Sequence, residues 1–236
     1  MQTIDIEDIK NKLYIKLKES GWGNRFKTFI LSEDFEKILN TLLNQVNNGK
    51  RFTPPIKQMF SAFEKCQYSD LKVIMISPDP YPYGMIADGM AFSCSNDMKP
   101  QASLKYMFKA IQSTVYDNQP YNYDADLTRW ANQGILLLNL SLTTEIEKVN
   151  KHNHIWNPFI MFLFDILNSY NNGLIYVFIG KQSQEWIDTI SDNNHKLSCT
   201  HPASAAYRGQ EHWDCNDIFN KISKLVKDHY NFDIKW

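Results

Sequence analysis

Residues 71–93 decide how this chain folds, and they read LKVIMISPDPYPYGMIADGMAFS. The largely apolar run 71–76 is rich in β-branched residues and predicts a buried strand. This strand must end at Pro78, because two prolines one residue apart exclude further helix or central strand. Each proline also pushes the residue before it into an extended conformation, which puts Asp79 on a stiff loop. A carboxylate at the carboxyl end of a buried strand lies where open α/β sheets bind their ligands, although an Asp-Pro pair can also simply initiate a turn.

The composition is that of an ordinary globular protein. Hydrophobic residues make up 43% of the 236 residues and charged residues 22%, a balance that lacks the signature of a disordered chain. This length accommodates a large core, so we expect residues 1–236 to form a single domain. The formal net charge is −1, so a polyanionic partner must be bound by a local patch of basic residues and not by an overall positive field.

The cysteines show no metal-binding pattern, since none of them forms a CxxC pair. They are Cys66, Cys94, Cys199 and Cys215. We therefore expect reduced thiols and no zinc, iron–sulfur or other metal site. The N-terminal sequence MQTIDIEDIK is acidic and mixed, unlike a signal peptide, and no apolar run reaches the roughly 20 residues of a membrane span. These features predict a soluble cytoplasmic protein without a membrane partner.

Apolar strands alternate with helices along the chain. Besides the strand before Asp79, apolar runs predict strands at 135–139 and 174–179 and a weaker one at 195–200. Apolar residues at helical spacing predict helices over 4–19, 35–46, 156–167 and 214–228, a helix opened by residues 53–55, one entered at 99–103 and one ending at 128–134. The alternation predicts an α/β protein with three layers, α/β/α, around a central, mostly parallel four-stranded sheet.

A polar or glycine-containing signal follows each predicted strand. These signals are Asp79, Asn139, the pair Gly180-Lys181, and His201. Because the carboxyl ends of parallel strands meet at one edge of a sheet, we expect these residues to line one cleft. Taken singly, each has an ordinary explanation: Asn139 as a turn or cap residue, His201 as a loop residue before proline, and the nearby Phe92 as a core residue. Their joint placement at the strand ends favours a functional site.

Such a cleft has the parts needed to break a bond between a sugar and a base. The carboxamide of an asparagine carries a donor and an acceptor, so it can pair with the adjacent N–H and C=O groups of a uracil-like ring. An aromatic side chain can stack on that ring, and a histidine can donate to a carbonyl that gains negative charge. An aspartate can stabilise a cationic sugar or position the attacking water. These residue types suit the hydrolysis of an N-glycosidic bond with an anionic base as the leaving group.

Separated motifs follow one another in the sequence: DPY at 79–81, GMAFS at 89–93, PQASL at 100–104, QGILLLN at 133–139 with LT at 142–143, and HP at 201–202 with YRG at 207–209. In this order they resemble the water-activating loop, base-stacking segment, proline-rich loop, uracil-reading strand and minor-groove loop of the family 1 uracil-DNA glycosylases. The resemblance covers about residues 20–228. Several motifs in the right order are far more specific than one pattern. The resemblance implies a monofunctional enzyme of base excision repair, without metal or other cofactor, that releases uracil from DNA and leaves an abasic site.

The resemblance also implies a role for each matching residue. Asp79 would orient the water and balance the charge of the sugar cation, and His201 would hydrogen-bond uracil O2. Asn139 would read uracil O4 and N3, Phe92 would stack on the flipped base, and Tyr81 would exclude the methyl group of thymine. The target must leave the base stack before any of these contacts form. The residues implied to lie on or near the DNA are Ser103, Gly180, Lys181, Ser204, Ala205, Tyr207 and Arg208.

The chain departs from the family pattern at four single positions and in one loop. In the uracil pocket, Pro78 stands where the family offers a backbone N–H near uracil O2, and proline has no such donor. Pro82 replaces a histidine, Asp88 stands where a second histidine is usual, and Lys181 replaces a serine and can hold a phosphate by its charge. The minor-groove loop at 203–206 is one residue shorter and lacks the leucine wedge. Wedges help to offset the cost of unstacking, so we expect a preference for single-stranded or weakly paired uracil.

Three functions fit these observations. The first is a monomeric uracil-DNA glycosylase acting on single- or double-stranded DNA, and the retained set of catalytic and pocket residues favours it. The second is a catalytically weak or inactive glycosylase-fold protein that binds DNA or assists replication, which the altered loop around Asp79 favours. The third is a glycosylase for another modified pyrimidine. The expected partners are uracil-containing DNA and, beyond it, a proteinaceous glycosylase inhibitor or a replication partner. The divergence fits a viral or phage enzyme in bacterial or infected-host cytoplasm.

Overall fold

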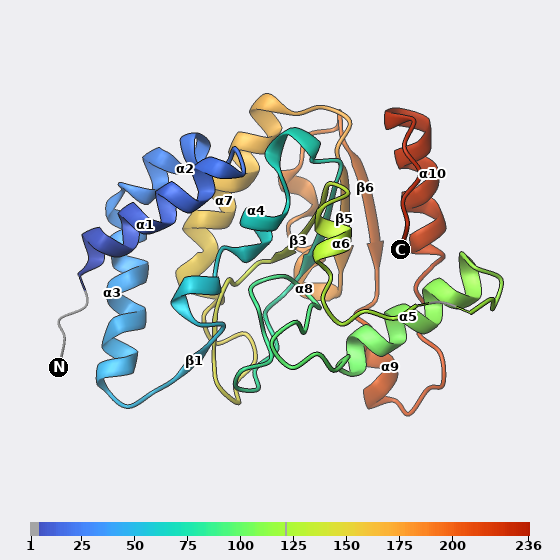
Figure 1. Ribbon diagram of the computed structural model, residues 1–236, viewed down its shortest axis with the longest axis horizontal. Coiled ribbons are helices and arrows are strands. Elements are labelled where there is room, and N and C mark those ends of the chain that lie inside the picture. Colours follow the sequence, from blue (N-terminus) through green and yellow to red (C-terminus); the bar gives the residue numbers. More distant parts are fainter. Residues whose placement is uncertain (1–4, 121) are drawn as a thin grey trace.

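A parallel four-stranded sheet forms the centre of the protein, with the strand order β3-β2-β5-β6. The computed structural model describes residues 5–120 and 122–236, and Figure 1 shows the arrangement of its elements. The strands are β2 (Val73–Ser77), β3 (Ile135–Asn139), β5 (Ile175–Ile179) and β6 (His195–Cys199). This sheet confirms the predicted α/β class and the four predicted strands.

The burial of the strands explains their sequence patterns. All five residues of β2, β3 and β5 are buried, because a parallel sheet covered by helices has no polar face. β6 is an edge strand, and of its residues only Cys199 is fully buried, which accounts for its weaker apolar pattern. The pairing of β2 with β3 runs from Val73↔Ile135 to Ser77↔Asn139. The carboxyl ends of these two strands therefore lie level with each other.

Helices lie on both sides of the sheet, as Figure 1 shows. On one side, α1, α2, α3 and α7 pack against one another; on the other, α10 contacts β5, β6 and α5. Their bounds are Ile6–Glu19 for α1, Gly23–Ile30 for α2, Glu33–Asn47 for α3, Ala102–Thr114 for α5, Thr128–Ala131 for α6, Asn153–Tyr170 for α7 and Ile218–Tyr230 for α10. Ser32 caps the start of α3, because its hydroxyl accepts a hydrogen bond of 3.3 Å from the N–H of Phe35. The predicted first helix included residue 4, which lies outside the described residues.

The prediction of a helix opened by residues 53–55 is wrong. Phe52–Thr53 instead forms strand β1, which pairs antiparallel with β4 (Thr144–Glu145). The consecutive prolines keep this stretch extended, and the pairing with a segment far along the chain fixes it there. A 3-10 turn, η1 (Ile56–Gln58), and a short helix, α4 (Ser61–Lys65), follow. The elements α2, α8 (Lys181–Gln184), α9 (Ala203–Tyr207), η2 (Tyr68–Asp70) and η3 (Ile187–Thr189) also have no predicted counterpart.

The described residues share one hydrophobic core. Its buried side chains run from Leu13 in α1 to Trp236 at the C-terminus. Trp236 is 1% exposed and packs its ring edge-on against Trp130, at 5.2 Å between ring centroids. Aromatic packing of this kind adds to the stability gained from burial alone. None of the helices in the described part of the chain combines the length and the apolar character that a membrane crossing requires.

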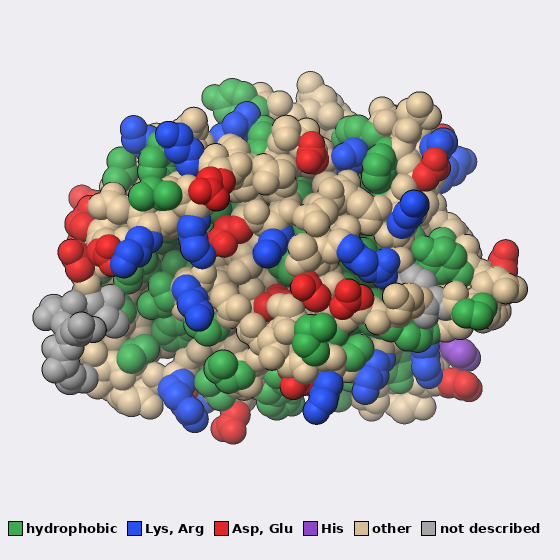
Figure 2. Space-filling model, viewed as in Figure 1, with side chains coloured by type: hydrophobic (Ala, Val, Ile, Leu, Met, Phe, Trp, Pro, Cys, Tyr) green, Lys and Arg blue, Asp and Glu red, His purple; other side chains and the backbone are tan. Residues whose placement is uncertain are grey.

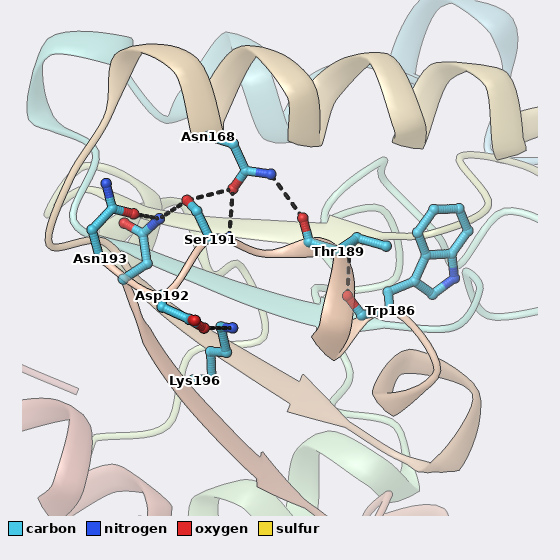
Figure 3. A network of polar contacts seen from close by, with 8 residues as sticks. Asn168, Trp186, Thr189, Ser191, Asp192, Asn193 and Lys196 are labelled. Atoms are coloured by element: carbon cyan, nitrogen blue, oxygen red, sulfur yellow. Dashed lines mark hydrogen bonds and ion pairs between the residues drawn. The ribbon is translucent and has the colours of Figure 1, made fainter.

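Figure 3 shows a polar network that fixes the connection between β5 and β6. Asn168 on α7 donates from Nδ2 to the carbonyl of Thr189 at 2.8 Å, and its Oδ1 accepts from the N–H and the hydroxyl of Ser191 at 3.0 Å each. Lys196 on β6 forms an ion pair of 2.7 Å with Asp192. The edge strand therefore starts from a fixed position, and the chain leaves it toward His201.

Candidate active site

A cleft of about 260 Å³ lies at the carboxyl ends of β2 and β6. Six of the residues predicted from the sequence line it: Asp79, Tyr81, Phe92, Ser103, His201 and Tyr207. They come from the loop after β2, the loop before α5, α5 itself and the segment after β6. In Figure 1 these loops lie with α9 at the lower end of the molecule. The structure thus places together residues that are more than 100 positions apart in the sequence, as the parallel sheet predicts.

Asp79 is held by the main chain of a distant segment. Its Oδ2 accepts a hydrogen bond of 2.6 Å from the N–H of Asn150. Burial raises the pKa of the Asp79 carboxyl to about 6, and the Asn150 amide opposes this rise because it stabilises the charged form. At neutral pH the carboxylate is therefore ionised but poorly solvated, which suits a group that must balance a developing positive charge.

His201 is a neutral hydrogen-bond donor at physiological pH. Burial lowers the pKa of His201 to about 4, because a buried site disfavours the charged imidazolium. Its Nδ1 accepts a hydrogen bond of 3.2 Å from the N–H of Ala203, which leaves the proton on Nε2. The close neighbour Gly180 makes room for this ring, since a Cβ at Gly180 would lie 3.1 Å from the His201 Cβ.

Phe92 closes one side of the cleft with an unusual backbone. Its φ of 65° lies in the left-handed region, which is rare for a bulky residue and is found where the surrounding structure enforces it. The ring centroid of Phe92 is 5.7 Å from that of His201. Tyr81 donates its hydroxyl to the Phe92 carbonyl at 3.1 Å, and burial raises the pKa of Tyr81 well above 10, so this donor stays protonated. Three residues of the predicted set are thus fixed relative to one another.

Asp88 has a supporting role that sequence reasoning missed. It is buried, at 3% exposed, and its carboxylate accepts from the Ser93 hydroxyl at 2.5 Å and from the Met90 N–H at 3.0 Å. It also accepts from the N–H and the hydroxyl of Ser95, at 2.9 and 2.7 Å. These four contacts wrap the segment that carries Phe92 around one carboxylate, which holds the strained turn in place. The sequence pattern that could have indicated this role is the pair Ser93 and Ser95, which follow Asp88 within seven residues.

Asn139 presents an unused acceptor at the end of β3. It is 4% exposed and lies in register with Ser77, which lines the cleft. Its Oδ1 has no hydrogen-bond partner among the residues that the structure describes. Leaving such a buried acceptor unpaired costs about 1–3 kcal/mol, so a ligand N–H that pairs with it would recover this energy. The carbonyl of the neighbouring Pro78 is already used, since it accepts from the Ser141 N–H at 3.0 Å.

The residues predicted to contact DNA surround the cleft to different extents. Seven of the predicted site residues are absent from the cleft lining among the described residues. They are Pro78, Asn139, Gly180, Lys181, Ser204, Ala205 and Arg208. Lys181 and Arg208 are exposed, Ser204 is half-buried, and Gly180 is buried. Tyr207 protrudes into solvent, at 89% exposed.

Ala205 requires a correction. Its side chain is 1% exposed and packs inward from α9, so it cannot contact DNA in place of a wedge. The exposed large side chain on this helix is that of Tyr207, two residues further on.

Two exposed apolar residues at the cleft had not been predicted. Tyr83 is 59% exposed and Val149 is 61% exposed, and both line the cleft beside Tyr207. Val149 belongs to the segment between β4 and α7 that also supplies the amide to Asp79. No motif marks this segment, because its role depends on a contact between positions 71 residues apart.

Comparisons with known proteins identify the family of this chain. No family model matches the chain. The uracil-DNA glycosylase of Amoebophilus asiaticus (strain 5a2) is 33% identical over 213 residues, covering 87% of this chain and 94% of the relative, and that of Acinetobacter baumannii (strain SDF) is 28% identical over 232 residues, covering 98% and 97%. The crystal structure of mimivirus uracil-DNA glycosylase has the same fold, with a TM-score of 0.79 at 19% identity over 93% of this chain and 88% of that one. Mimivirus UNG Y322L in complex with UGI gives a TM-score of 0.80 at 20% identity, over 93% and 90%. The identity and coverage of the Amoebophilus relative show that this chain belongs to the uracil-DNA glycosylase family.

Proposed function

We propose that the protein hydrolyses the N-glycosidic bond of a flipped-out uracil in DNA and leaves an abasic site. The observation that carries this proposal is the pairing, in one cleft, of a carboxylate ionised above about pH 6 with a neutral imidazole whose Nε2 is protonated. Hydrolysis of this bond needs an anion near the sugar and a donor near the base. Curated relatives named uracil-DNA glycosylase support the same reaction.

In the proposed reaction the base is held before the bond breaks. Asn139, with its unpaired buried Oδ1, would accept from uracil N3–H, and its amide group would donate to O4. Cytosine presents the opposite pattern at these atoms, so the carboxamide would reject it. The Phe92 ring would stack on the base, and Tyr81, fixed through its hydroxyl, would leave no space for the methyl group of thymine. Pro78 would lie beside uracil O2.

The bond then breaks with its electron pair leaving on the uracil ring. His201 would donate from Nε2–H to O2, where the negative charge collects, without giving up its proton. Asp79 would stabilise the positive charge on the sugar and orient the water whose oxygen bonds to C1′. The water proton passes first to Asp79 and then to solvent or to the released base.

DNA would be bound by local contacts around the cleft. Figure 2 shows acidic and basic side chains intermixed on the face that it draws, in keeping with the net charge of −1. We assign the backbone contacts to Ser103, Gly180, Lys181, Ser204 and Arg208. Tyr207, 89% exposed at the mouth of the cleft, takes the place of the missing wedge. With few cations engaged, the affinity should fall only moderately with salt.

The proposed catalytic unit is the whole chain, 1–236, as one domain and one monomer. The described residues share one core that runs from α1 to Trp236. The substrate is uracil-containing DNA, single- or double-stranded. A proteinaceous inhibitor is a further proposed partner, because a structural neighbour is a UNG bound to UGI. We also propose a replication partner. The proposed location is the cytoplasm of bacterial or infected-host cells.

Uracil release from a labelled oligonucleotide tests this function. Single strands, U·A duplexes and U·G duplexes should lose uracil and become sensitive to alkali, whereas the matched cytosine and thymine oligonucleotides should remain intact. The Asp79→Asn variant is the control for contaminating activity. Tight binding to the oligonucleotides without any release of uracil would overturn the assignment of an enzyme.

A further inference from the structure

The loop that carries Asp79 is held at both ends by one distant segment. This clamp segment, residues 145–150, donates from the Asn150 N–H to the Asp79 Oδ2 at 2.6 Å. It also donates from the Glu147 N–H to the Pro82 carbonyl at 2.7 Å. The Asp-Pro-Tyr motif runs from the first attachment point, Asp79, to the residue before the second, Pro82.

The clamp segment has its own anchors, which do not involve Asp79. The Ile146 N–H donates to the Arg51 carbonyl at 2.9 Å, beside the pairing of β1 with β4. The Thr144 hydroxyl donates to the Lys148 carbonyl at 2.6 Å, and the Lys148 ammonium donates to Glu145 Oε1 at 2.5 Å. The position of the Asn150 amide is therefore set by the clamp segment, and Asp79 is brought to it.

The backbone of Asn150 lies in the left-handed region, with φ at 57°. Asparagine and glycine adopt this conformation readily, and β-branched residues do not. The Asn150 Oδ1 is buried and has no hydrogen-bond partner within the described chain. The contact with Asp79 that the structure shows is thus made by the main chain, and the side chain matters through the conformation it permits.

We propose that Asn150 is the positioning residue for Asp79: its left-handed backbone presents the amide that binds Oδ2 and leaves Oδ1 for the water and the sugar. This inference rests on the proposed function for its catalytic meaning, although the contact itself can be tested without any reaction. In a carboxylate with one oxygen fixed by an amide, the other oxygen has a defined direction, which is what a group that orients a water needs.

The same amide keeps Asp79 a stronger acid than burial alone would allow, because it binds the ionised form. The other titratable side chains that line the cleft are Tyr81, Tyr83, His201 and Tyr207. The charged side chains on the clamp segment are Glu145, Glu147 and Lys148, with Lys151 and His152 following it. Burial and the Asn150 amide are the causes that act on the Asp79 pKa, so loss of the amide should make Asp79 a weaker acid.

Substitutions at Asn150 that differ in their tolerance of the left-handed region test the proposal. Asn150→Gly keeps the conformation and the amide, and it should retain activity within about twofold at all pH values. Asn150→Ala and Asn150→Val are increasingly strained there, with the alanine as the variant that still folds if the valine does not. The matched controls are Asn231→Gly and Asn231→Val, because Asn231 has φ at 48° at the end of α10, away from the cleft.

The readout that needs no catalysis is the titration of the Asp79 carboxyl carbon by ¹³C NMR. We expect a midpoint at about 6 in the wild type, the same midpoint in Asn150→Gly, and a higher one in Asn150→Ala and Asn150→Val. An acid ten times weaker would lower the ionised fraction, and hence kcat at pH 6, roughly fivefold. The Asn231 variants should leave the midpoint unchanged. An unmoved midpoint in the strained Asn150 variants would overturn the proposal.

A second arm asks whether Asn150 acts through Asp79. Adding Asn150→Val to Asp79→Asn should not lower the residual kcat further, because no carboxylate remains to be positioned. A further loss in the double variant would mean a merely structural effect and would overturn the proposal. If no variant or wild type releases uracil but the NMR midpoint moves as expected, the proposed function fails while the positioning contact stands.

Discussion

Replacing Asp79 by asparagine should stabilise the fold at neutral pH while removing most of the activity. Burial raises the pKa of Asp79 from 3.8 to about 6, so the folded protein binds this proton more tightly than the unfolded chain does. The stability that the protonated group contributes is fully present below pH 3.8 and is lost as the pH rises through about 6. The difference in pKa corresponds to about 3 kcal/mol. Because Asp79 is only half-buried, solvent screening reduces the expected gain to about 2 kcal/mol.

Asparagine suits this test because its carboxamide oxygen can still accept from the Asn150 N–H. We expect Asp79→Asn to be more stable than the wild type by about 2 kcal/mol at pH 8, and the difference to approach zero at pH 4. Urea denaturation of both proteins between these pH values measures it. Taking the difference removes the titrations of His152 and His201, whose pKa values are both lowered to about 4 by burial. An Asp165→Asn variant, altered at an exposed position of α7, is the control for the removal of one carboxylate.

The same variant should release uracil at least roughly a thousandfold more slowly in single-turnover experiments, since the charge that stabilises the transition state is gone. A variant less stable than the wild type at pH 8 would show that the carboxylate is favourably solvated or paired, which contradicts its raised pKa. Near-normal release of uracil would remove Asp79 from the mechanism.

Other substitutions probe the pocket and the DNA contacts. Asn139→Asp should lower uracil release and admit cytosine, because a carboxylate lacks the donor that distinguishes the two bases; release of cytosine from a labelled strand measures this, and no gain at any pH would contradict the assignment. Tyr207→Ala should slow release from U·A duplexes by roughly tenfold more than release from single strands, with Tyr207→Phe close to the wild type; an equal effect on both substrates would exclude a wedge. Gly180→Ala forces a Cβ to 3.1 Å from the His201 Cβ at a φ of 92°, so kcat should fall by about tenfold or more, and an unchanged kcat would show that His201 tolerates displacement.

The sheet could be predicted from the sequence because β2, β3 and β5 are each a continuous, fully buried run of mostly apolar residues. β3 occupies residues 135–139, as expected from the sequence ILLLN, and all of them are buried. The pairing of β1 with β4 could not be predicted, since strands of two residues have no periodicity and exist only through the contact between them. The short helix α9 was missed for a related reason. Five residues are too few for a periodic apolar face, and its position depends on the preceding turn at His201.

The site shows the same division. Of the strand-end residues predicted to line one cleft, Asp79 and His201 do so, because the parallel topology brings the ends of their strands to one edge of the sheet. Asn139 and the pair Gly180-Lys181 are not part of the lining. The hydrogen-bond partner that acts on the pKa of Asp79 could not be predicted, because the Asn150 amide is 71 residues away in the sequence. The solvent exposure of individual side chains could not be predicted from the sequence either. Ala205 and Tyr207 are two positions apart on α9, yet one is 1% and the other 89% exposed, and only the docking of that helix decides which of them faces the DNA.

Burial shifts the pKa values of the two proposed catalytic groups in opposite directions, and this difference indicates which of them limits activity at low pH. Removing solvent disfavours charge, so it raises the pKa of Asp79 to about 6 and lowers that of His201 to about 4. Both groups are in their useful forms above about pH 6: the aspartate is charged and the histidine is neutral. Between pH 6 and pH 4 the aspartate becomes protonated while the histidine is still neutral. The loss of kcat in this range therefore reports the ionisation of Asp79 alone, which is why substitutions at Asn150, and not at residues around the imidazole, should shift it.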